Sequence, residues 1–342
     1  MKRLLSVIIV LAVALGVACL YYGWGLRPAD PRGEARLIYL PPGQGVWAMA
    51  SVLRREGVVR SAPAFYIAYR LQMRKGQGGK LPGSYFDISP ADSVPTIIST
   101  RLQESAVRRV TFPEGFSMRQ MAERIGSSDL LISEQAFVQA ARPDTVKGAV
   151  AFRLPKSSLE GYLFPDTYEF PVGTQAGDVI REMVKTFQAK FYHANEQRIG
   201  RSAQSLHELV TIASLIEREA KLDKDRRLIS SVIHNRLRKG MRLQIDATVQ
   251  YALPRHKQRL LHSDLRIDSP YNTYRHAGLP PGPINLPEGR IIDKVLDYEK
   301  HNYIYFCAKE DLSGYHAFAK TYDEHQANAR RYQKALNKLN IR

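Results

Sequence analysis

Ala213-Ser214-Leu215-Ile216-Glu217-Arg218-Glu219 is the stretch around which the larger part of this 342-residue chain is expected to fold. It belongs to a predicted helix over residues 205–221, in which aliphatic side chains recur every three or four positions and form one apolar face. With about 100° of rotation per residue, Glu219 falls inside that face and Glu217 falls at its edge. A carboxyl group among apolar side chains is difficult to ionise, so its pKa is expected to rise. Glu219 is therefore the anomalous residue of the helix.

The position of Glu219 allows two interpretations. A carboxyl group with a raised pKa suits general acid catalysis near neutral pH, of the kind used to cleave carbohydrates. Alternatively, Glu219 is a buried structural acid that an arginine such as Arg236 or Arg242 neutralises. The helical pattern alone leaves both interpretations open.

Cleavage of a glycosidic bond normally needs a second carboxylate. Glu217 lies about 200° around the helix from Glu219, so the two cannot flank one bond together. The second group would then come from one of three aspartates further along the chain: Asp246, Asp264 and Asp268. A substrate that supplies its own nucleophile needs only one acid, and the C6 hydroxyl of muramic acid can attack its own C1.

The first 27 residues indicate a membrane-spanning helix. Basic residues at positions 2 and 3 are followed by no charge until Arg27, and this uncharged run is long enough to cross a bilayer, which takes about 20 apolar residues. Tyr21, Tyr22 and Trp24 stand at its far end, where an interfacial aromatic belt is expected. The basic tip places the N-terminus in the cytoplasm and the rest of the chain outside it. A cleaved signal peptide is the alternative, and it exports the same part of the chain.

Composition limits the partners and cofactors. Lys and Arg number 50 against 33 Asp and Glu, and the net charge of +17 favours an anionic partner such as nucleic acid, anionic lipid or an acidic wall polymer. The basic residues are scattered and form no nucleic-acid recognition motif, so we expect no nucleic acid partner. The two cysteines, Cys19 and Cys307, and nine histidines without paired ligand spacing predict neither a disulfide framework nor a metal site.

The spacing of apolar residues predicts an α+β protein in three parts. Residues 1–27 are the cytoplasmic tip and transmembrane anchor, residues 28–106 a small α+β module with its linker, and residues 107–342 a larger mixed α/β domain. In the small module the expected elements are a strand at 35–40, helices at 46–55 and 62–73, a strand at 83–88 and a helix at 93–102. In the larger domain we expect helices at 118–125, 179–193, 205–221, 226–238 and 323–339, a strand at 303–307, and a loop-rich segment up to Pro287.

Several sequence blocks, taken in order, resemble the endolytic murein transglycosylases of the YceG-like (MltG) family. The blocks are Glu160-Gly161-Tyr162-Leu163-Phe164-Pro165-Asp166-Thr167-Tyr168, Ala213–Glu219, Asn235-Arg236-Leu237, Met241-Arg242-Leu243-Gln244-Ile245-Asp246, Tyr271-Asn272-Thr273-Tyr274 and Gly278-Leu279-Pro280-Pro281-Gly282. The match covers nearly the whole chain, including the anchor and the small module, which is LysM-like in that family. Two departures stand beside these blocks: Ala247 replaces a usual proline, and Asn285-Leu286-Pro287-Glu288 replaces a tighter Asn-Pro-Gly turn. Both should change loop stiffness more than chemistry.

The resemblance implies a lyase without a cofactor, in which residues 107–342 form the catalytic domain. Glu219 would be the catalytic acid that cleaves the MurNAc–GlcNAc β-1,4 bond of nascent glycan strands and leaves 1,6-anhydro-MurNAc ends. The implied substrate-binding residues are Glu217, Asn235, Gln244, Asp246, Thr248, Tyr251, Tyr271, Asn272, Thr273 and Tyr274. A loop-bracing role is the alternative for each cleft residue, and for Asn235 above all.

The resemblance also implies partners and a location. The partners would be peptidoglycan glycan strands and complexes of penicillin-binding proteins or other cell-wall synthases, with the enzyme acting as a terminase of glycan elongation. The protein would be a single-pass protein of the inner (cytoplasmic) membrane, with its catalytic domain on the periplasmic side. Two other functions stay open at this point: a non-catalytic murein-binding scaffold for synthases, and a muramidase that uses water.

Overall fold

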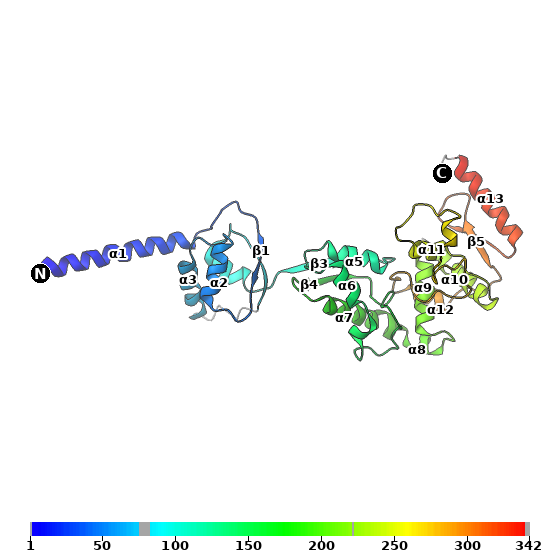
Figure 1. Ribbon diagram of the computed structural model, residues 1–342, viewed down its shortest axis with the longest axis horizontal. Coiled ribbons are helices and arrows are strands. Elements are labelled where there is room, and N and C mark those ends of the chain that lie inside the picture. The colour runs from blue at the N-terminus through cyan, green and yellow to red at the C-terminus, as the bar shows by residue number, and fades with distance from the viewer. Residues whose placement is uncertain (1, 75–82, 221, 339–342) are drawn as a thin grey trace. The chain divides into compact units, whose positions relative to one another are not determined.

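The computed structural model has a mixed α/β architecture with an apolar helix at its N-terminus, as the sequence predicts (Figure 1). The structure describes residues 2–74, 83–220 and 222–338. The chain divides into two compact units. The first comprises Met1–Arg109, Asp129–Leu131 and Glu169–Thr174, and the second comprises Val110–Ser128, Ile132–Tyr168 and Gln175–Arg342. Each unit buries its own set of large apolar side chains.

Helix α1 (Lys2–Leu26) is long and apolar enough over Arg3–Leu26 to cross a membrane, judged by its length and composition. Its hydrophobic run is exposed, but its last turn packs on the apolar core of the small module. There Tyr22 and Leu26 contact the core, and the Ser61 hydroxyl donates a hydrogen bond of 3.1 Å to the hydroxyl of Tyr21. The apolar helix is therefore continuous with the module that follows it.

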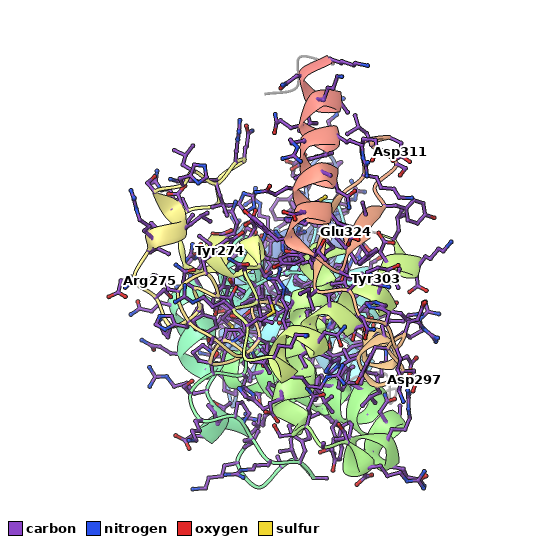
Figure 2. The ribbon with its side chains drawn as sticks, turned by 90° about the vertical axis from the view of Figure 1, so that its right-hand side faces the viewer. Tyr274, Arg275, Asp297, Tyr303, Asp311 and Glu324 are labelled. Atoms are coloured by element: carbon purple, nitrogen blue, oxygen red, sulfur yellow. The ribbon has the colours of Figure 1, made fainter. Side chains whose placement is uncertain are left out.

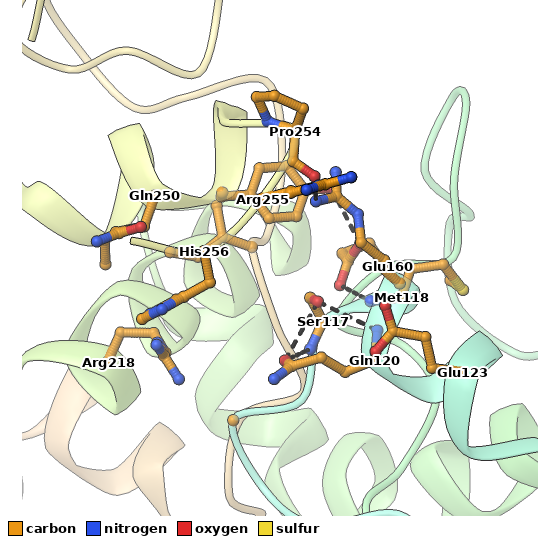
Figure 3. Close-up of a pocket in the computed structure, with 15 residues that line it drawn as sticks. Ser117, Met118, Gln120, Glu123, Glu160, Arg218, Gln250, Pro254, Arg255 and His256 are labelled. Atoms are coloured by element: carbon orange, nitrogen blue, oxygen red, sulfur yellow. Dashed lines mark hydrogen bonds between the residues drawn. The ribbon is translucent and has the colours of Figure 1, made fainter. Parts of the chain in front are cut away.

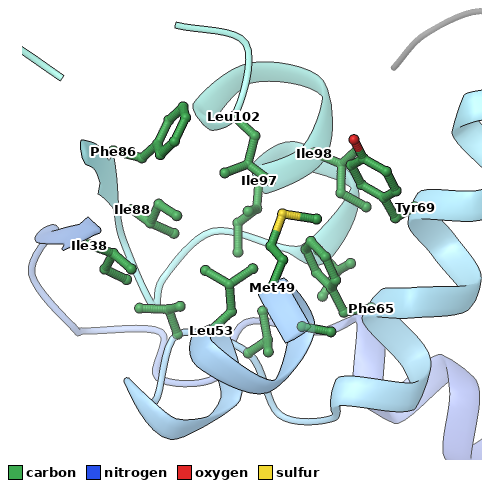
Figure 4. Close-up of a cluster of buried hydrophobic side chains, with 14 of the residues drawn as sticks. Ile38, Met49, Leu53, Phe65, Tyr69, Phe86, Ile88, Ile97, Ile98 and Leu102 are labelled. Atoms are coloured by element: carbon green, nitrogen blue, oxygen red, sulfur yellow. The ribbon is translucent and has the colours of Figure 1, made fainter. Parts of the chain in front are cut away.

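The strands and helices of the small module lie within one residue of the expected bounds. They are β1 (Arg36–Leu40), α2 (Val46–Arg55), α3 (Ala62–Arg74), β2 (Ser84–Ile88), α4 (Val94–Thr96) and the π-helical turn Ile97–Arg101. The two strands pair antiparallel, with Ile38 opposite Phe86. Because alternate side chains of a strand point to one face, these two residues meet Leu53, Phe65 and Ile97 in one apolar core (Figure 4).

The rest of the chain is mostly helical. Its elements are β3 (Val107–Thr111), α5 (Met118–Gly126), α6 (Glu134–Ala140), a 3-10 turn (Pro143–Val146), β4 (Thr167–Pro171), α7 (Ala176–Phe187), a π-helical turn (Gln188–Tyr192), α8 (His193–Arg201), α9 (Leu206–Glu219), α10 (Asp223–Arg238), α11 (Asp246–Ala252), a 3-10 turn (Asp264–Arg266), α12 (Ile291–Leu296), β5 (Tyr305–Ala308), β6 (His316–Ala319) and α13 (Tyr322–Lys338). β3 pairs with β4, and β5 pairs with β6.

Helix α9 lies at the centre of the second unit. The Ser205 side chain and Glu208 form a capping box at its start, which explains why the helix begins there. Every residue of Leu209–Ile216 is buried, because α10, α11 and α12 all contact this helix. The expectation of a single apolar face was therefore wrong over Leu209–Ile216, where α9 is covered on all sides. Its expected last residue, Lys221, lies outside the described residues.

One further expectation is corrected. The helix expected at 179–193 begins earlier and continues through the π-helical turn into α8, ending at Arg201. The segment before Pro287 is rich in loops, as expected, and it also contains α11. This helix has only seven residues, which is too short for a periodic apolar pattern to reveal.

The C-terminal part is a β-hairpin followed by α13 (Figure 2). The hairpin is attached to α10 through Asp225, whose carboxylate accepts hydrogen bonds from the backbone N–H of His316 at 2.6 Å and from its ring Nδ1 at 2.8 Å. Glu324, labelled near the start of α13, accepts from the N–H groups of Lys320 and Thr321 at the start of that helix. The expected last residue of α13, Leu339, lies outside the described residues.

Candidate active site

Glu219 is the last residue of α9 and lies half-buried beside the first turn of α11. Burial raises the pKa of its carboxyl to about 7, and the negative charge of Asp246 adds to the rise. A hydrogen bond from the backbone of Ala247 and the positive charge of Arg218 lower the pKa by less. The carboxyl can therefore change its protonation state near neutral pH, as a group that acts first as acid and then as base must do.

Neither arginine that could have neutralised Glu219 does so. The guanidinium of Arg236 donates to the backbone carbonyls of Ile304 at 2.6 Å, Leu243 at 2.7 Å and Arg242 at 3.1 Å. The side chain of Arg242 is exposed. Within the described ranges, Glu219 takes part in no ion pair. Its burial is therefore not compensated by an ion pair, which is unusual for a purely structural acid.

Of the three candidate second carboxylates, Asp246 is the one that affects Glu219. The Tyr274 hydroxyl donates a 2.6 Å hydrogen bond to Asp246, and both residues interact electrostatically with Glu219. Asp264 instead binds Lys257 at 2.6 Å, and Asp268 binds Arg275 at 2.9 Å. Glu219, Asp246 and Tyr274 thus form one group of acidic and phenolic side chains.

Gln244 is exposed and lies two residues before Asp246. Its backbone has a conformation that residues other than glycine rarely adopt. Its φ of +53° belongs to the left-handed region, and its N–H donates to the carbonyl of Thr273 at 3.1 Å. The amide oxygen accepts a hydrogen bond of 3.3 Å from Arg236. This conformation presents the Gln244 side chain to solvent beside the acidic group.

Three predicted substrate-binding residues hold the loop behind that group. Asn272 is fully buried and donates to the carbonyls of Leu265 and Ile267 at 3.0 and 2.9 Å, while its own oxygen accepts from the N–H of Tyr274. The hydroxyls of Thr248 and Thr273 are buried and lie 2.9 Å apart, and a second contact joins Thr273 to the N–H of Ile245 at 3.0 Å. These side chains position their neighbours through backbone groups.

Asn235 and Glu217 are placed away from the acidic group. The amide of Asn235 donates to the carbonyls of His301 and Tyr303 at 2.8 and 2.9 Å, so it braces α10 against the C-terminal segment. Glu217 lies 3.4 Å from Arg226 and accepts the N–H of Glu288 at 3.0 Å. The Glu288 carboxylate also pairs with that arginine, so one departure from the family pattern adds an acid to this ion cluster.

Glu160 is a residue that sequence reasoning did not single out. It is 3% exposed, and its carboxylate accepts hydrogen bonds from the Met118 N–H at 2.7 Å and the Tyr251 hydroxyl at 2.9 Å. Burial raises its pKa to about 7. The sequence shows only that Gly161 follows directly. In the structure this glycine has a φ of +80°, and a Cβ there would meet Pro283 at 2.5 Å.

Glu160 lines an open cavity of about 470 Å³ (Figure 3). Arg218 and Ala247, which flank Glu219, line the same cavity. The rings of Tyr251 and Tyr271 lie 4.8 Å apart next to Glu160, and Tyr271 lines a second cavity of about 370 Å³ that Glu160 also borders. Tyr251 and Tyr271 therefore stand between two hollows rather than directly at Glu219, whereas Tyr274 belongs to the acidic group there.

The chain is similar to known proteins over most of its length. The model of the YceG-like family matches residues 38–331. The chain is 35% identical to an endolytic murein transglycosylase of Bacillus subtilis, over 94% of this chain and 92% of the relative. It is 26% identical to an endolytic murein transglycosylase of Streptococcus pneumoniae, over 90% of this chain and 61% of that one.

A solved structure is also similar. The crystal structure of a yceG-like protein from Listeria monocytogenes matches with a TM-score of 0.59 and 31% identity, covering 86% of this chain and 98% of that one. The family resemblance inferred from the sequence blocks is confirmed, and the chain belongs to the YceG-like family.

Proposed function

We propose that this protein is a membrane-anchored endolytic lytic transglycosylase of murein, with Glu219 as its single catalytic acid and base. The observation that carries the proposal is the Glu219 carboxyl: half-buried, without an ion-pair partner in the described part of the chain, and with a pKa raised to about 7. The names of the curated relatives support murein as the substrate.

The proposed reaction needs no water. Protonated Glu219 donates its proton to the oxygen that joins MurNAc C1 to the next GlcNAc, and the C1–O bond breaks. The resulting carboxylate then takes the proton of the muramic C6 hydroxyl, whose oxygen bonds to C1 and forms the 1,6-anhydro ring. Glu219 ends protonated again, so one carboxyl with a pKa near neutrality serves both steps.

The finer organisation belongs to the same proposal. The small module of the first unit acts as a LysM-like module, residues 107–342 as the catalytic domain, and α1 as an uncleaved inner-membrane anchor with the catalytic domain on the periplasmic side. The packing of Tyr22 and Leu26 on the module core supports an anchor, because cleavage after the apolar run would remove part of that core. A short tether also suits a terminase that acts on nascent strands beside synthases.

The nature of the new glycan ends tests this function. We expect mass spectrometry of murein strands incubated with the full chain in detergent to show 1,6-anhydro-MurNAc ends. Reducing MurNAc ends would instead indicate a muramidase that uses water. Asp246 would then be the second carboxylate, because its charge acts on Glu219. Binding of strands without new ends would favour a scaffold.

The replacement Asp246→Asn tests whether the charge of Asp246 raises the pKa of Glu219. The negative charge of Asp246 raises the pKa of Glu219, so its removal should lower that pKa. Because the protonated form starts the reaction, kcat/KM should then begin to fall at a lower pH than in the unmodified protein. The Tyr274 hydroxyl can still donate to the new amide oxygen, which limits structural change.

The pH profile of kcat/KM provides the measurement. Asp268→Asn, which removes an exposed carboxylate paired with Arg275, serves as a control and should leave the profile in place. An alkaline limb that stays fixed or moves to higher pH in Asp246→Asn would contradict the proposed coupling.

A further inference from the structure

We propose that the cavity lined by Glu160 and Arg218 binds the peptide attached to the muramic acid residue, through the carboxylates of that peptide. The inference rests on the proposed function, because it concerns the substrate of the same site. It assigns a task to cationic side chains that the cleavage reaction does not use.

The cavity lies directly beside the catalytic carboxyl. Arg218 and Ala247 both line it. Arg218 directly precedes Glu219 in α9, and the backbone N–H of Ala247 donates a hydrogen bond to the Glu219 carboxyl. In murein, the peptide is attached to the same muramic ring whose C1 reacts. When that ring is positioned at Glu219, the attachment point of its peptide lies no more than the width of one sugar ring from the carboxyl. The cavity is a hollow of about 470 Å³ at that location.

The charges around the cavity favour an anionic occupant. Its lining includes three arginines, Arg119, Arg218 and Arg255, against the two carboxyl groups of Glu123 and Glu160. Figure 3 shows Arg218 and His256 on one side of the hollow, and Met118, Glu123 and Glu160 on the other side. A neutral sugar would need few cations, whereas a guanidinium matches a carboxylate with two parallel hydrogen bonds.

Two of these cations are available to a ligand. Arg119 is not one of them, because it donates to the carbonyls of Leu253 and Pro254 at 3.2 and 2.6 Å. The guanidinium groups of Arg218 and Arg255, by contrast, form no hydrogen bond or ion pair with any residue in the described parts of the chain. Both side chains are exposed, so they can close on a carboxylate without breaking a contact in the fold.

Cleavage of two matched substrates by the full chain in detergent tests the inference. One substrate is murein glycan that carries its peptides, and the other is the same glycan after an amidase has removed them. The measured quantity is the ratio of kcat/KM on the first to kcat/KM on the second. This ratio cancels any influence of Arg218 on the acidity of Glu219, since that influence acts on both substrates.

We expect Arg255→Gln to lower this ratio about threefold, and the double replacement Arg218→Gln with Arg255→Gln to lower it about tenfold. Arg259→Gln is the matched control, because this exposed arginine lies in the same loop as Arg255 but outside the cavity lining. The ratio of kcat/KM values measured for this variant should equal that of the unmodified protein. Thermal unfolding of each variant checks that the fold is intact.

The outcomes separate the two proposals. If the unmodified protein cleaves both substrates and the double replacement leaves the ratio unchanged, the peptide site is wrong and the proposed function stands. If the arginines instead bound the lactyl carboxylate that the amidase exposes on the muramic ring, the double replacement would raise the ratio, and the peptide site would again be wrong. If the unmodified protein cleaves neither substrate, the proposed function fails, and the peptide site fails with it.

Discussion

Replacing Glu219 with glutamine is expected to lower kcat for murein cleavage at least about a thousandfold. A positioned general acid or base contributes about 10²–10⁴ in rate, and in the proposed reaction the same carboxyl serves both roles. Glutamine has nearly the same size but cannot donate a proton to the glycosidic oxygen. Because Glu219 makes no ion pair in the described residues, the replacement also leaves no buried cation unpaired. The loss should therefore be chemical rather than structural.

The control for this replacement is Asp268→Asn. It removes another candidate carboxylate, which is exposed and paired with Arg275, and should change kcat by less than about twofold. Formation of anhydro ends and binding of glycan strands should be measured for both variants. Retained binding with lost cleavage in Glu219→Gln would exclude a scaffold, whereas normal cleavage by this variant would show that another group is the acid.

The fold was most predictable where the periodicity of apolar residues was local. The strands and helices of the small module follow their patterns within one residue, since each element of a two-layer module hides one face. Helix α9 could not be described correctly in this way. Its surroundings are α10, α11 and α12, which come later in the chain, and no local pattern reports that they cover it on every side.

The raised pKa of Glu219 could be predicted from the sequence, whereas the hydrogen-bond partners of the amide side chains could not. Glu219 could be singled out because an ionisable group among aliphatic residues violates the pattern around it. Asn272 carries no such signal, since an amide in a motif looks the same whether it faces a sugar or a backbone carbonyl. Glu160 is buried by Met118 and Tyr251, which lie 42 and 91 residues away along the chain, so only the folded structure reveals its environment.

Arg236 is another buried side chain that positions the site through contacts with residues distant in the sequence. It is buried, donates to three backbone carbonyls, and lies over the ring of Tyr305 at 5.1 Å. Two of those carbonyls belong to the loop that leads to Gln244 and Asp246. The guanidinium therefore joins this loop to the C-terminal segment, and it fixes the backbone from which Asp246 approaches Glu219.

Arg236→Met should consequently destabilise the second unit by about 3 kcal/mol. Methionine keeps an apolar stem of similar length and relieves the burial of a charge, but it leaves three carbonyls without their donor. The midpoint of thermal unfolding should fall by about 6–12 °C for a unit of this size. Arg242→Met is the matched control, because this neighbouring arginine in the same loop is exposed, and its midpoint should change little. Equal midpoints for the two variants would mean that the buried guanidinium does not hold the loop, and the placement of Asp246 would then need another cause.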